Sequence, residues 1–511
     1  MRRRRLGLLV VPLLALALGP LAAGGPRALA DPGVRTAAPT TATTAVPVPT
    51  DSLDWGRCAD SYLRSIGARC TSLAVPLDPD QPDGRTITLA LSRVRHTSPA
   101  ADYQGAIVLN PGGPGGSGLT MSGLSQRLPA SVASTYDWIG FDPRGIGASR
   151  PLLRCDRDMF GYGRPAYQPS AARIRAWKQR DRAYAATCAR EHPDLLAHDT
   201  TADTAHDVDR IREALGLDQI TWFGYSYGTY IGQVYGTLFP DRVRRMVLDS
   251  NVDPRSVWYR STYGQARAME PNLNAFFGWI ARHHRVYDLG STRQQVRRAW
   301  VAQRDRLTRH PVGGRRSVGG AEWTDSFLYA VYSSSLWPFF AGTFSRWVHQ
   351  HDLARLRYQF EAFNGVGDDN SFAGYLAVSC SEGTYPRSFD TWASDTTAAA
   401  RRSPLLAWPL TWFQEPCRTW AVHDSPLVDI DLSGVSSGLL IDQVHDAATP
   451  FEGSLEVRSR FPGARLLKIT GDRAVDHAAS LSGDACVDGR IAAYLRDGSL
   501  PARAEIGRAH V

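Results

Sequence analysis

A serine flanked by glycines carries the strongest chemical signal in this chain of 511 residues. The motif Gly224-Tyr225-Ser226-Tyr227-Gly228 follows an apolar run, 220–223, and precedes a run with helical character, 229–238. A strand, a strained turn and a helix in this order expose a serine hydroxyl at the end of a sheet, where it can attack a carbonyl carbon. A glycine-rich turn with an incidental serine is the alternative, but it leaves the flanking runs unexplained. The sequence therefore predicts that Ser226 is a catalytic nucleophile.

A second glycine-rich segment, NPGGPGGSG at 110–118, supplies what an activated serine needs next. Glycines let backbone N–H groups approach the oxygen that becomes negative during acyl transfer. We expect the N–H groups of Gly113 and Tyr227 to form this oxyanion hole, with Gly112 as a near alternative to Gly113. A phosphate-binding loop is the rival interpretation, but the segment lacks the Gly-Lys-Ser/Thr ending of such loops.

The serine also needs a base, and the last histidines along the chain are His445, His477 and His510. His510 lies in 505–511, EIGRAHV, which resembles the translation of a common sequencing adapter, so we do not expect it to belong to the native fold. His445 directly precedes the candidate acid and cannot easily turn back onto its neighbour. His477 follows the apolar run 465–470 at a spacing typical of a loop, and we predict that it is the base. The alternative for His477 is an exposed loop histidine.

An acidic residue must hold the imidazole ring and stabilise its protonated form. Asp446 lies in HDAATP, 445–450, after the apolar run 437–441. Asp442 is a rival, but it lies in or beside that strand. Asp476 adjoins His477 and is expected to be exposed to solvent. The sequence therefore favours Asp446.

Metal chemistry has weaker support. The pairs His283-His284 and His349-Gln350-His351-Asp352 have some ligand character. The sequence has no third ligand at metal-site spacing and no HExxH motif. Solvated helix faces account better for these residues, so we predict neither a metal nor a cofactor.

The candidate site residues must be positioned by a sheet. Short β-rich runs alternate with helical patterns, which favours an α/β fold with a mostly parallel sheet and helices on both faces. A helix fits residues 204–215, with Gly216 as its stop signal. The candidate strands are 87–94, 106–110, 138–142, 220–224, 245–249, 438–441 and 465–469.

The alternation of strands and helices breaks down between residues 254 and 426. This stretch has helical patterns and carries ten of the fourteen tryptophans. We expect it to form a helical cap inserted between two segments of the sheet domain, 55–253 and 427–504. Most of its aromatic residues should form the core of the cap, and a minority should line an apolar substrate cleft.

The amino-terminal segment has the pattern of an export signal. Four arginines, Arg2 to Arg5, precede the apolar run 6–23, and Ala28-Leu29-Ala30 offers a cleavage site. Prolines interrupt the run, which favours cleavage over a membrane anchor. We expect residues 1–30 to be removed, residues 31–54 to form a flexible leader or propeptide, and the mature protein to be secreted without a membrane segment.

The charge gives no support for a nucleic-acid partner. The formal net charge is +8, but residues 1–30 carry five arginines and no acidic residue, so the chain without them has a formal charge of +3. A nearly balanced chain lacks the basic surface that nucleic-acid binding requires.

Taken together, these motifs resemble the secreted tripeptidyl and prolyl aminopeptidases of actinobacteria, which are α/β-hydrolase serine peptidases with a TAP-like C-terminal region. The resemblance runs from about Trp55 to Pro501. Besides the two glycine-rich motifs it rests on GFDPRGIGAS (140–149), DAATP (446–450) and AYLRDGSLP (493–501). It implies an α/β-hydrolase fold with a large helical cap and a catalytic triad of Ser226, Asp446 and His477.

The resemblance also implies a substrate. Such enzymes release tripeptides or terminal residues from peptides with a free amino terminus. Glu382, in a Cys-x-Glu element of the cap, would pair with that amino group. An ordinary surface glutamate is the alternative. A carboxylesterase or lipase of the same fold, with the same triad, is an alternative function. A homologue with impaired activity is another, because Asp476 and Ala478 flank His477 where relatives usually have glycine.

Seven cysteines in an exported chain favour disulfides with one cysteine left over. Proximity along the sequence predicts the pairs Cys58–Cys70, Cys155–Cys188 and Cys380–Cys417, which leaves Cys486. Relatives often have a last cysteine just beyond the element that corresponds to 493–501, so a native partner of Cys486 is expected after Ala504.

Overall fold

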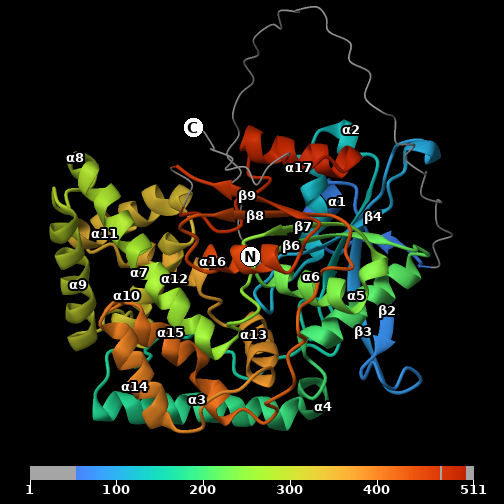
Figure 1. Ribbon diagram of the computed structural model, residues 1–511. Helices are drawn as coiled ribbons and strands as arrows, with labels where there is room; N and C mark the ends of the chain where they lie inside the picture. The colour runs from blue at the N-terminus through green and yellow to red at the C-terminus, as the bar shows by residue number, and fades with distance from the viewer. Residues whose placement is uncertain (1–52, 472–474, 502–511) are drawn as a thin grey trace, which may run out of the picture.

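The computed structural model describes residues 53–471 and 475–501 (Figure 1). The predicted export signal, nearly all of the predicted leader and the suspected adapter segment lie outside these residues. Within the two ranges, no helix combines the length and the apolar character that crossing a bilayer requires.

A nine-stranded sheet forms the centre of the fold, in the order β1-β2-β3-β5-β4-β6-β7-β8-β9. The strands β1, β2, β3 and β5 pair antiparallel, and the pairs from β5 through β4 to β9 are parallel. The strand bounds are β1 Gly56–Arg57, β2 Arg69–Pro76, β3 Thr86–Val94, β4 Ala106–Asn110, β5 Asp137–Asp142, β6 Ile220–Tyr225, β7 Val243–Asp249, β8 Gly438–Gln443 and β9 Ala464–Ile469.

The central strands are apolar along their whole length because both of their faces are covered. In β4, Ile107 and Leu109 belong to one apolar cluster and Ala106 and Val108 to the other. Parallel strands buried in this way have continuous rather than alternating hydrophobic sequences. The seven predicted strands are all present, with ends that differ by at most two residues.

The strands β1 and β2 were not predicted. These two strands lie at the antiparallel edge of the sheet, and most residues of β2 are partly or fully exposed. An edge strand that packs on one side only does not need a long apolar run. The disulfide Cys58–Cys70 closes the chain between them.

Helices cover both faces of the sheet (Figure 1). On one face lie α2 (Ala130–Ala133) and α17 (Ala485–Asp497), and on the other α5 (Thr201–Ala214), α6 (Tyr227–Leu238) and α16 (Glu452–Ser459). The helix predicted at 204–215 begins three residues earlier than expected, because Thr200 and Asp203 form a capping box at its start. Gly216, with a φ of 66°, follows its end as predicted.

Between β7 and β8 the described chain contributes helices and no strand to the sheet. Eight of the ten tryptophans in this part are buried, so most of them form core as expected. The helices are α7 (Tyr259–Arg282), α8 (His284–Tyr287), α9 (Arg293–Arg309), α10 (Gly320–Ser326), α11 (Trp337–Gln350), α12 (Leu353–Phe363), α13 (Asn370–Ser381), α14 (Phe389–Ala400) and α15 (Ala407–Gln414).

One long helix from the first part of the chain lies with these later helices. Figure 1 shows α3 (Ala171–Glu191) away from the sheet and beside α14, and the short α1 (Ser61–Ser65) and α4 (Pro193–Leu196) complete the α-helices. Short 3-10 segments occur at Ala100–Asp102, Leu119–Arg127, Pro240–Arg242, Gly314–Arg316, Leu328–Val331, Ser334–Leu336 and Glu415–Thr419.

Two further disulfides hold this region. Cys155 is bonded to Cys188 of α3, and Cys380 of α13 is bonded to Cys417. All three disulfides that sequence proximity predicted are therefore formed. Cys486 is exposed and has no disulfide partner among the described residues.

Candidate active site

Ser226 lies in the sharp turn between β6 and α6. Its φ of 54° is a left-handed conformation that costs a non-glycine residue energy and persists only where the surroundings enforce it. Gly228 is one reason that the turn is possible, since a Cβ there would lie 2.5 Å from the carbonyl oxygen of Asn110. The Ser226 side chain is half-buried at the start of α6.

The glycine-rich segment packs directly on this turn. A Cβ on Gly112 would lie 2.5 Å from the carbonyl oxygen of Tyr225 and 2.8 Å from the nitrogen of Tyr227, so the contact requires glycine. The side chain of Asn110 holds the loop by accepting a hydrogen bond from the Gly112 N–H (2.8 Å). In the described part of the chain, the N–H groups of Gly113 and Tyr227 donate to no other group, as oxyanion donors must.

Asp446 and His477 are in direct contact. The Nδ1 atom of His477 lies 2.7 Å from Oδ2 of Asp446, and both side chains are buried. The other carboxylate oxygen accepts hydrogen bonds from the N–H groups of Ala448 (2.8 Å) and Thr449 (3.0 Å). Four donors thus hold this carboxylate once the Thr449 hydroxyl is included. The Nε2 atom of His477 is the ring nitrogen left for a reacting group.

The proton affinity of His477 results from two opposing effects. Burial alone would lower the pKa of the imidazole, but the negative charge and the hydrogen bond of Asp446, with the charge of Asp249, outweigh burial and raise the pKa above its ordinary value. A base with a raised pKa accepts a proton more readily, which suits the removal of a proton from a serine hydroxyl.

The end of β7 joins the serine turn to the histidine loop. The carbonyl oxygen of Asp249 accepts a hydrogen bond from the Ser226 N–H (3.0 Å), and its carboxylate accepts one from the Ser480 N–H (2.9 Å). Within the described residues, no hydrogen bond joins the Ser226 hydroxyl to His477. Such hydrogen bonds are often long in the free enzyme and tighten when substrate binds.

The helical part of the chain supports the histidine loop from the other side. The carbonyl oxygen of Tyr332 accepts a hydrogen bond from the His477 N–H (2.9 Å). Asp476 accepts hydrogen bonds from the N–H (2.6 Å) and the hydroxyl (2.8 Å) of Ser334. The expectation that Asp476 is exposed to solvent was wrong, because these contacts bury it to 4 % exposure.

The rival residues lie elsewhere. His445 is exposed, and its carbonyl oxygen accepts a hydrogen bond from the side chain of Asn272. Asp442 is inside β8, where its carboxylate accepts hydrogen bonds from the Ser454 hydroxyl and the Gln443 N–H. Burial, together with the charge of Asp446, raises the pKa of Asp442 well above its usual range. None of these hydrogen bonds of His445 and Asp442 involves the ring of His477.

Glu382 is buried to 3 % exposure, so it is not an ordinary surface glutamate. Its carboxylate accepts hydrogen bonds from the N–H and the hydroxyl of Thr201 and from the indole N–H of Trp258 (2.9 Å). The Thr201 hydroxyl lies 3.0 Å from the Tyr227 hydroxyl, which links Glu382 to the residue after the serine. Burial raises the pKa of Glu382 to about 7, although these hydrogen bonds oppose the shift.

Some of the supporting residues were not predicted. Thr449 has a signal in the sequence, because it lies three positions after Asp446, where its hydroxyl and N–H reach the same carboxylate. Tyr332 and Ser334 have no such signal. They are more than 140 positions from the residues that they contact, and their motif-free segment gives no hint of the contact.

The arrangement can perform acyl transfer. It combines a serine on a strained turn, a buried imidazole whose Nδ1 is held by a carboxylate, and two backbone donors at the start of α6 and in the adjoining glycine loop.

Comparisons with known proteins agree with this chemistry. A family model described as an alpha/beta hydrolase fold matches residues 105–335, and one described as TAP-like protein matches residues 403–506. The chain is 36% identical over 464 residues to a tripeptidyl aminopeptidase of Streptomyces coelicolor, covering 88% of this chain and 85% of that protein.

The chain is also similar to two mycobacterial proteins. Serine protease Hip1 of Mycobacterium tuberculosis is 29% identical over 479 residues, which cover 88% of this chain and 89% of that protein. Carboxylesterase B of the same organism is 30% identical over 484 residues, which cover 90% of each chain. The similarity to all three relatives therefore extends over nearly the whole chain.

Proposed function

This chain belongs to the tripeptidyl aminopeptidase family of α/β-hydrolase serine peptidases, and we propose that it is a secreted aminopeptidase. It releases tripeptides, or amino-terminal residues, from peptides whose amino terminus is free. The family, the α/β-hydrolase fold and the serine hydrolase class agree with the expectations from the sequence.

In the proposed reaction Ser226 is the nucleophile. His477 removes the proton from the Ser226 hydroxyl as its oxygen bonds to the scissile carbonyl carbon, and Asp446 stabilises the imidazolium that forms. The N–H groups of Gly113 and Tyr227 bind the oxyanion. The imidazolium then protonates the leaving amine as the C–N bond breaks, and water activated by His477 hydrolyses the acyl-enzyme.

The observation that supports this proposal most directly is the contact between His477 and Asp446. The 2.7 Å distance between Nδ1 and Oδ2 sets the tautomer and directs Nε2 toward a reacting group. It occurs in a chain that is 36% identical to a tripeptidyl aminopeptidase over most of its length.

Glu382 is the acidic residue that the proposal assigns to the substrate amino terminus. With a pKa of about 7, its carboxyl group is poised between its charged and neutral forms at neutral pH. A nearby ammonium group would favour the charged form of the carboxyl group, and the carboxylate would in turn stabilise the bound ammonium. The link through Thr201 to Tyr227 connects this charge to the serine turn.

Secretion is part of the same proposal. Three disulfides are typical of a protein that folds in an oxidising compartment. We propose that the chain is exported by residues 1–30, that residues 31–54 precede the folded enzyme, and that residues 254–426 form the cap over the site.

The proposal is tested with Ala-Pro-Ala-p-nitroanilide and its N-acetylated form, using the wild-type enzyme and Ser226→Ala. We expect wild-type enzyme to release p-nitroaniline from the free-amine form alone, and Ser226→Ala to lose this activity. Equal cleavage of both forms would refute an aminopeptidase and indicate an endopeptidase or an esterase.

A carboxylesterase is the second candidate, because one relative of 30% identity has that name. The same nucleophile, base and oxyanion donors would serve ester hydrolysis. The comparison of p-nitrophenyl butyrate with the free-amine anilide separates the two, since an esterase would cleave only the ester efficiently.

A further inference from the structure

Helix α13, which lies between β7 and β8 in the chain, packs against the glycine loop that contains a predicted oxyanion donor. A Cβ on Gly115 would overlap the carbonyl oxygen of Ser371 and would lie 3.0 Å from the nitrogen of Tyr375. Both of these atoms belong to the backbone of α13. Because the loop contacts the main chain of the helix itself, neither backbone can shift far toward the other.

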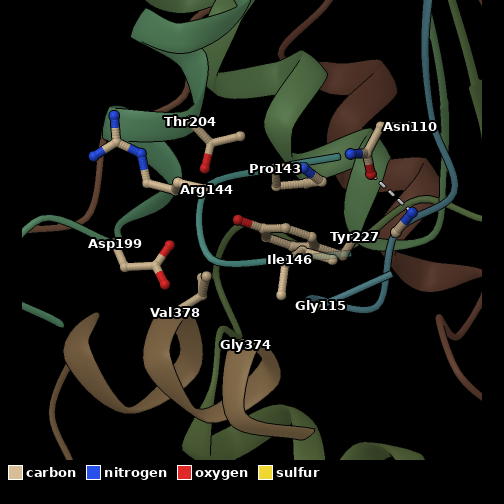
Figure 2. Close-up of a pocket in the computed structure, with 11 residues that line it drawn as sticks. Asn110, Gly115, Pro143, Arg144, Ile146, Asp199, Thr204, Tyr227, Gly374 and Val378 are labelled. Carbon is tan, nitrogen blue, oxygen red and sulfur yellow. Dashed lines mark hydrogen bonds between the residues drawn. The ribbon is translucent and has the colours of Figure 1, made fainter. Parts of the chain in front are cut away.

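Gly374 lies at the centre of this contact. In Figure 2 the side chain of Ile146 points toward the turn of α13 that carries Gly374, and the glycine loop with Gly115 lies beside it. A Cβ on Gly374 would overlap Cδ1 of Ile146 and would lie 3.1 Å from the Cα of Gly115. Ile146 is buried, and the hollow that these residues line has a volume of about 10 Å³, room for about one water molecule. An atom added to Gly374 must therefore displace Ile146 or the glycine loop.

The position of Gly115 is coupled to that of Gly113. The N–H of Gly116 donates a hydrogen bond to the carbonyl oxygen of Gly112 (3.1 Å), so residues 112–116 form one closed turn that contains Gly113. A Cβ on Gly113 would lie 2.9 Å from the nitrogens of Gly115 and Gly116, so the turn is tightly wound. A shift of Gly115 therefore moves the Gly113 N–H, and an oxyanion donor acts only within hydrogen-bond distance of the developing charge.

The start of α13 is held independently of the glycine loop. The Oδ1 atom of Asn370 accepts a hydrogen bond from the Gly147 N–H (2.9 Å). Its Nδ2 atom donates to the carbonyl oxygens of Gly145 (2.8 Å) and Leu153 (2.7 Å). These three hydrogen bonds hold the end of the helix that lies against the glycine loop to the segment that follows β5.

We infer that α13 positions the oxyanion hole, with Gly374 as a positioning residue that sets the place of the Gly113 N–H through Gly115. This role rests on the proposed function, because it takes Gly113 as an oxyanion donor. It gives a helix from the chain between β7 and β8 a part in stabilising the negative oxygen. Alanine favours a helix more than glycine does, but only glycine lets α13 approach the loop this closely.

Gly374→Ala tests this role, because the added methyl group displaces Ile146 or Gly115. We expect kcat for Ala-Pro-Ala-p-nitroanilide to fall about 10- to 100-fold, as misplacement of an oxyanion donor predicts. KM should stay within about twofold of wild type, since the affected interaction forms only in the transition state. A normal kcat, or a loss confined to KM, would overturn the inference.

The double variant Gly374→Ala/Ile146→Val separates positioning from general damage to the fold. Ile146→Val removes Cδ1, the atom that the added Cβ would overlap, and the pair of changes conserves the total volume. We expect kcat of the double variant to return to within about threefold of Ile146→Val alone. No recovery would show that the loss is not transmitted through this contact and would contradict the inference.

Gly264→Ala is the matched control. It makes the same substitution in helix α7, where a Cβ would meet no atom within 4 Å. This variant should keep the wild-type kcat, and thermal unfolding of each variant shows whether the fold persists. A loss of kcat in Gly264→Ala equal to that in Gly374→Ala would remove the support for a specific role of Gly374.

Labelling of Ser226 by a fluorophosphonate separates this inference from the proposed function. The serine oxygen bonds to phosphorus, fluoride leaves, and the serine proton passes to His477, so the reaction needs the oxyanion donors but no peptide. We expect the second-order rate constant to fall about 10-fold in Gly374→Ala, even if the wild-type enzyme cleaves no anilide.

Asn370→Ala loosens the same helix without adding an atom, and it keeps the inference testable if Gly374→Ala does not fold. We expect it to slow the labelling about threefold or more. An unchanged rate in folded Gly374→Ala, or in Asn370→Ala if only that variant folds, overturns the inference. A wild-type enzyme that is not labelled at all overturns it as well.

Discussion

At the scale of single residues, the candidate site depends on how each charge is compensated. Asp446 is a buried carboxylate with four hydrogen-bond donors around it, including His477. Asp442 and Asp199 are buried as well, but each has fewer donors, and their pKa values are raised. A carboxylate that must stabilise a positive imidazolium has to remain charged, so the donor count favours Asp446 for this task.

The effect of Asp446 on the pKa of His477 predicts how kcat/KM depends on pH. Because Asp446 raises the pKa of His477, and only neutral His477 can accept the serine proton, the acidic limb of kcat/KM should lie above pH 6.5, the usual pKa of histidine. Asp446→Asn removes the charge and should move this limb to lower pH. It should also lower kcat by about 10,000-fold, as loss of the orienting acid does in related sites.

The pH dependence of kcat/KM for the free-amine anilide measures both effects. Asp442→Asn is the control, since Asp442 does not contact the imidazole. If Asp442→Asn moved the limb and Asp446→Asn did not, the assignment of the acid would be wrong.

At the scale of elements, the site is assembled from both parts of the chain. The strands β6, β7 and β8 end at one edge of the sheet and carry Ser226, Asp249 and the loop of Asp446. The histidine loop follows β9 and is also tied to the 3-10 segments around Tyr332 and Ser334. The helical part of the chain therefore helps to hold the loop of His477.

The hydrogen bonds between Asp476 and Ser334 predict how kcat changes when the histidine loop is held less firmly. Asp476→Ala removes both acceptor contacts, and we expect kcat to fall about 10-fold because the imidazole is held less well. KM should change little. Steady-state kinetics measure this split, with thermal unfolding to show that the fold persists.

Asp497→Ala, at the exposed end of α17, is the matched control and should retain wild-type kcat. A normal kcat in Asp476→Ala would show that the other contacts of the loop suffice to place His477.

At the scale of the whole molecule, two disulfides cross-link segments of the helical part of the fold. Cys155–Cys188 joins α3 to the segment after β5, and Cys380–Cys417 joins α13 to the segment before β8. The second bond lies two residues before Glu382 and spans 37 positions of the sequence. Cross-links of this length restrict the unfolded chain appreciably.

The double variant Cys380→Ser/Cys417→Ser should therefore lower the free energy of unfolding by about 2–4 kcal/mol. Urea unfolding followed by tryptophan fluorescence measures this change, because the helical region holds most of the tryptophans. Cys486→Ser, which breaks no bond among the described residues, should unfold like wild type. An unchanged midpoint in the double variant would contradict the stabilising role of this disulfide.

The sequence by itself predicted the features that depend on local patterns. The parallel strands are short apolar runs because both of their faces are buried, and the serine turn and the glycine loop need glycine where backbone atoms nearly touch. The strands β1 and β2 at the edge of the sheet were not predicted, because the partly exposed β2 has no continuous apolar run. The choice of Asp446 and His477 over their rivals came from chain order and loop position.

Only the tertiary structure decided which groups meet. It buried Asp476 against Ser334, placed the carbonyl oxygen of Tyr332 on the N–H of His477, and left Oδ2 of Asp199 without a hydrogen-bond partner among the described residues. These contacts join segments that are far apart in the sequence, and their residues carry no motif of their own. Their positions follow from how the helical region packs on the sheet, and that packing is a property of the whole chain rather than of any one segment.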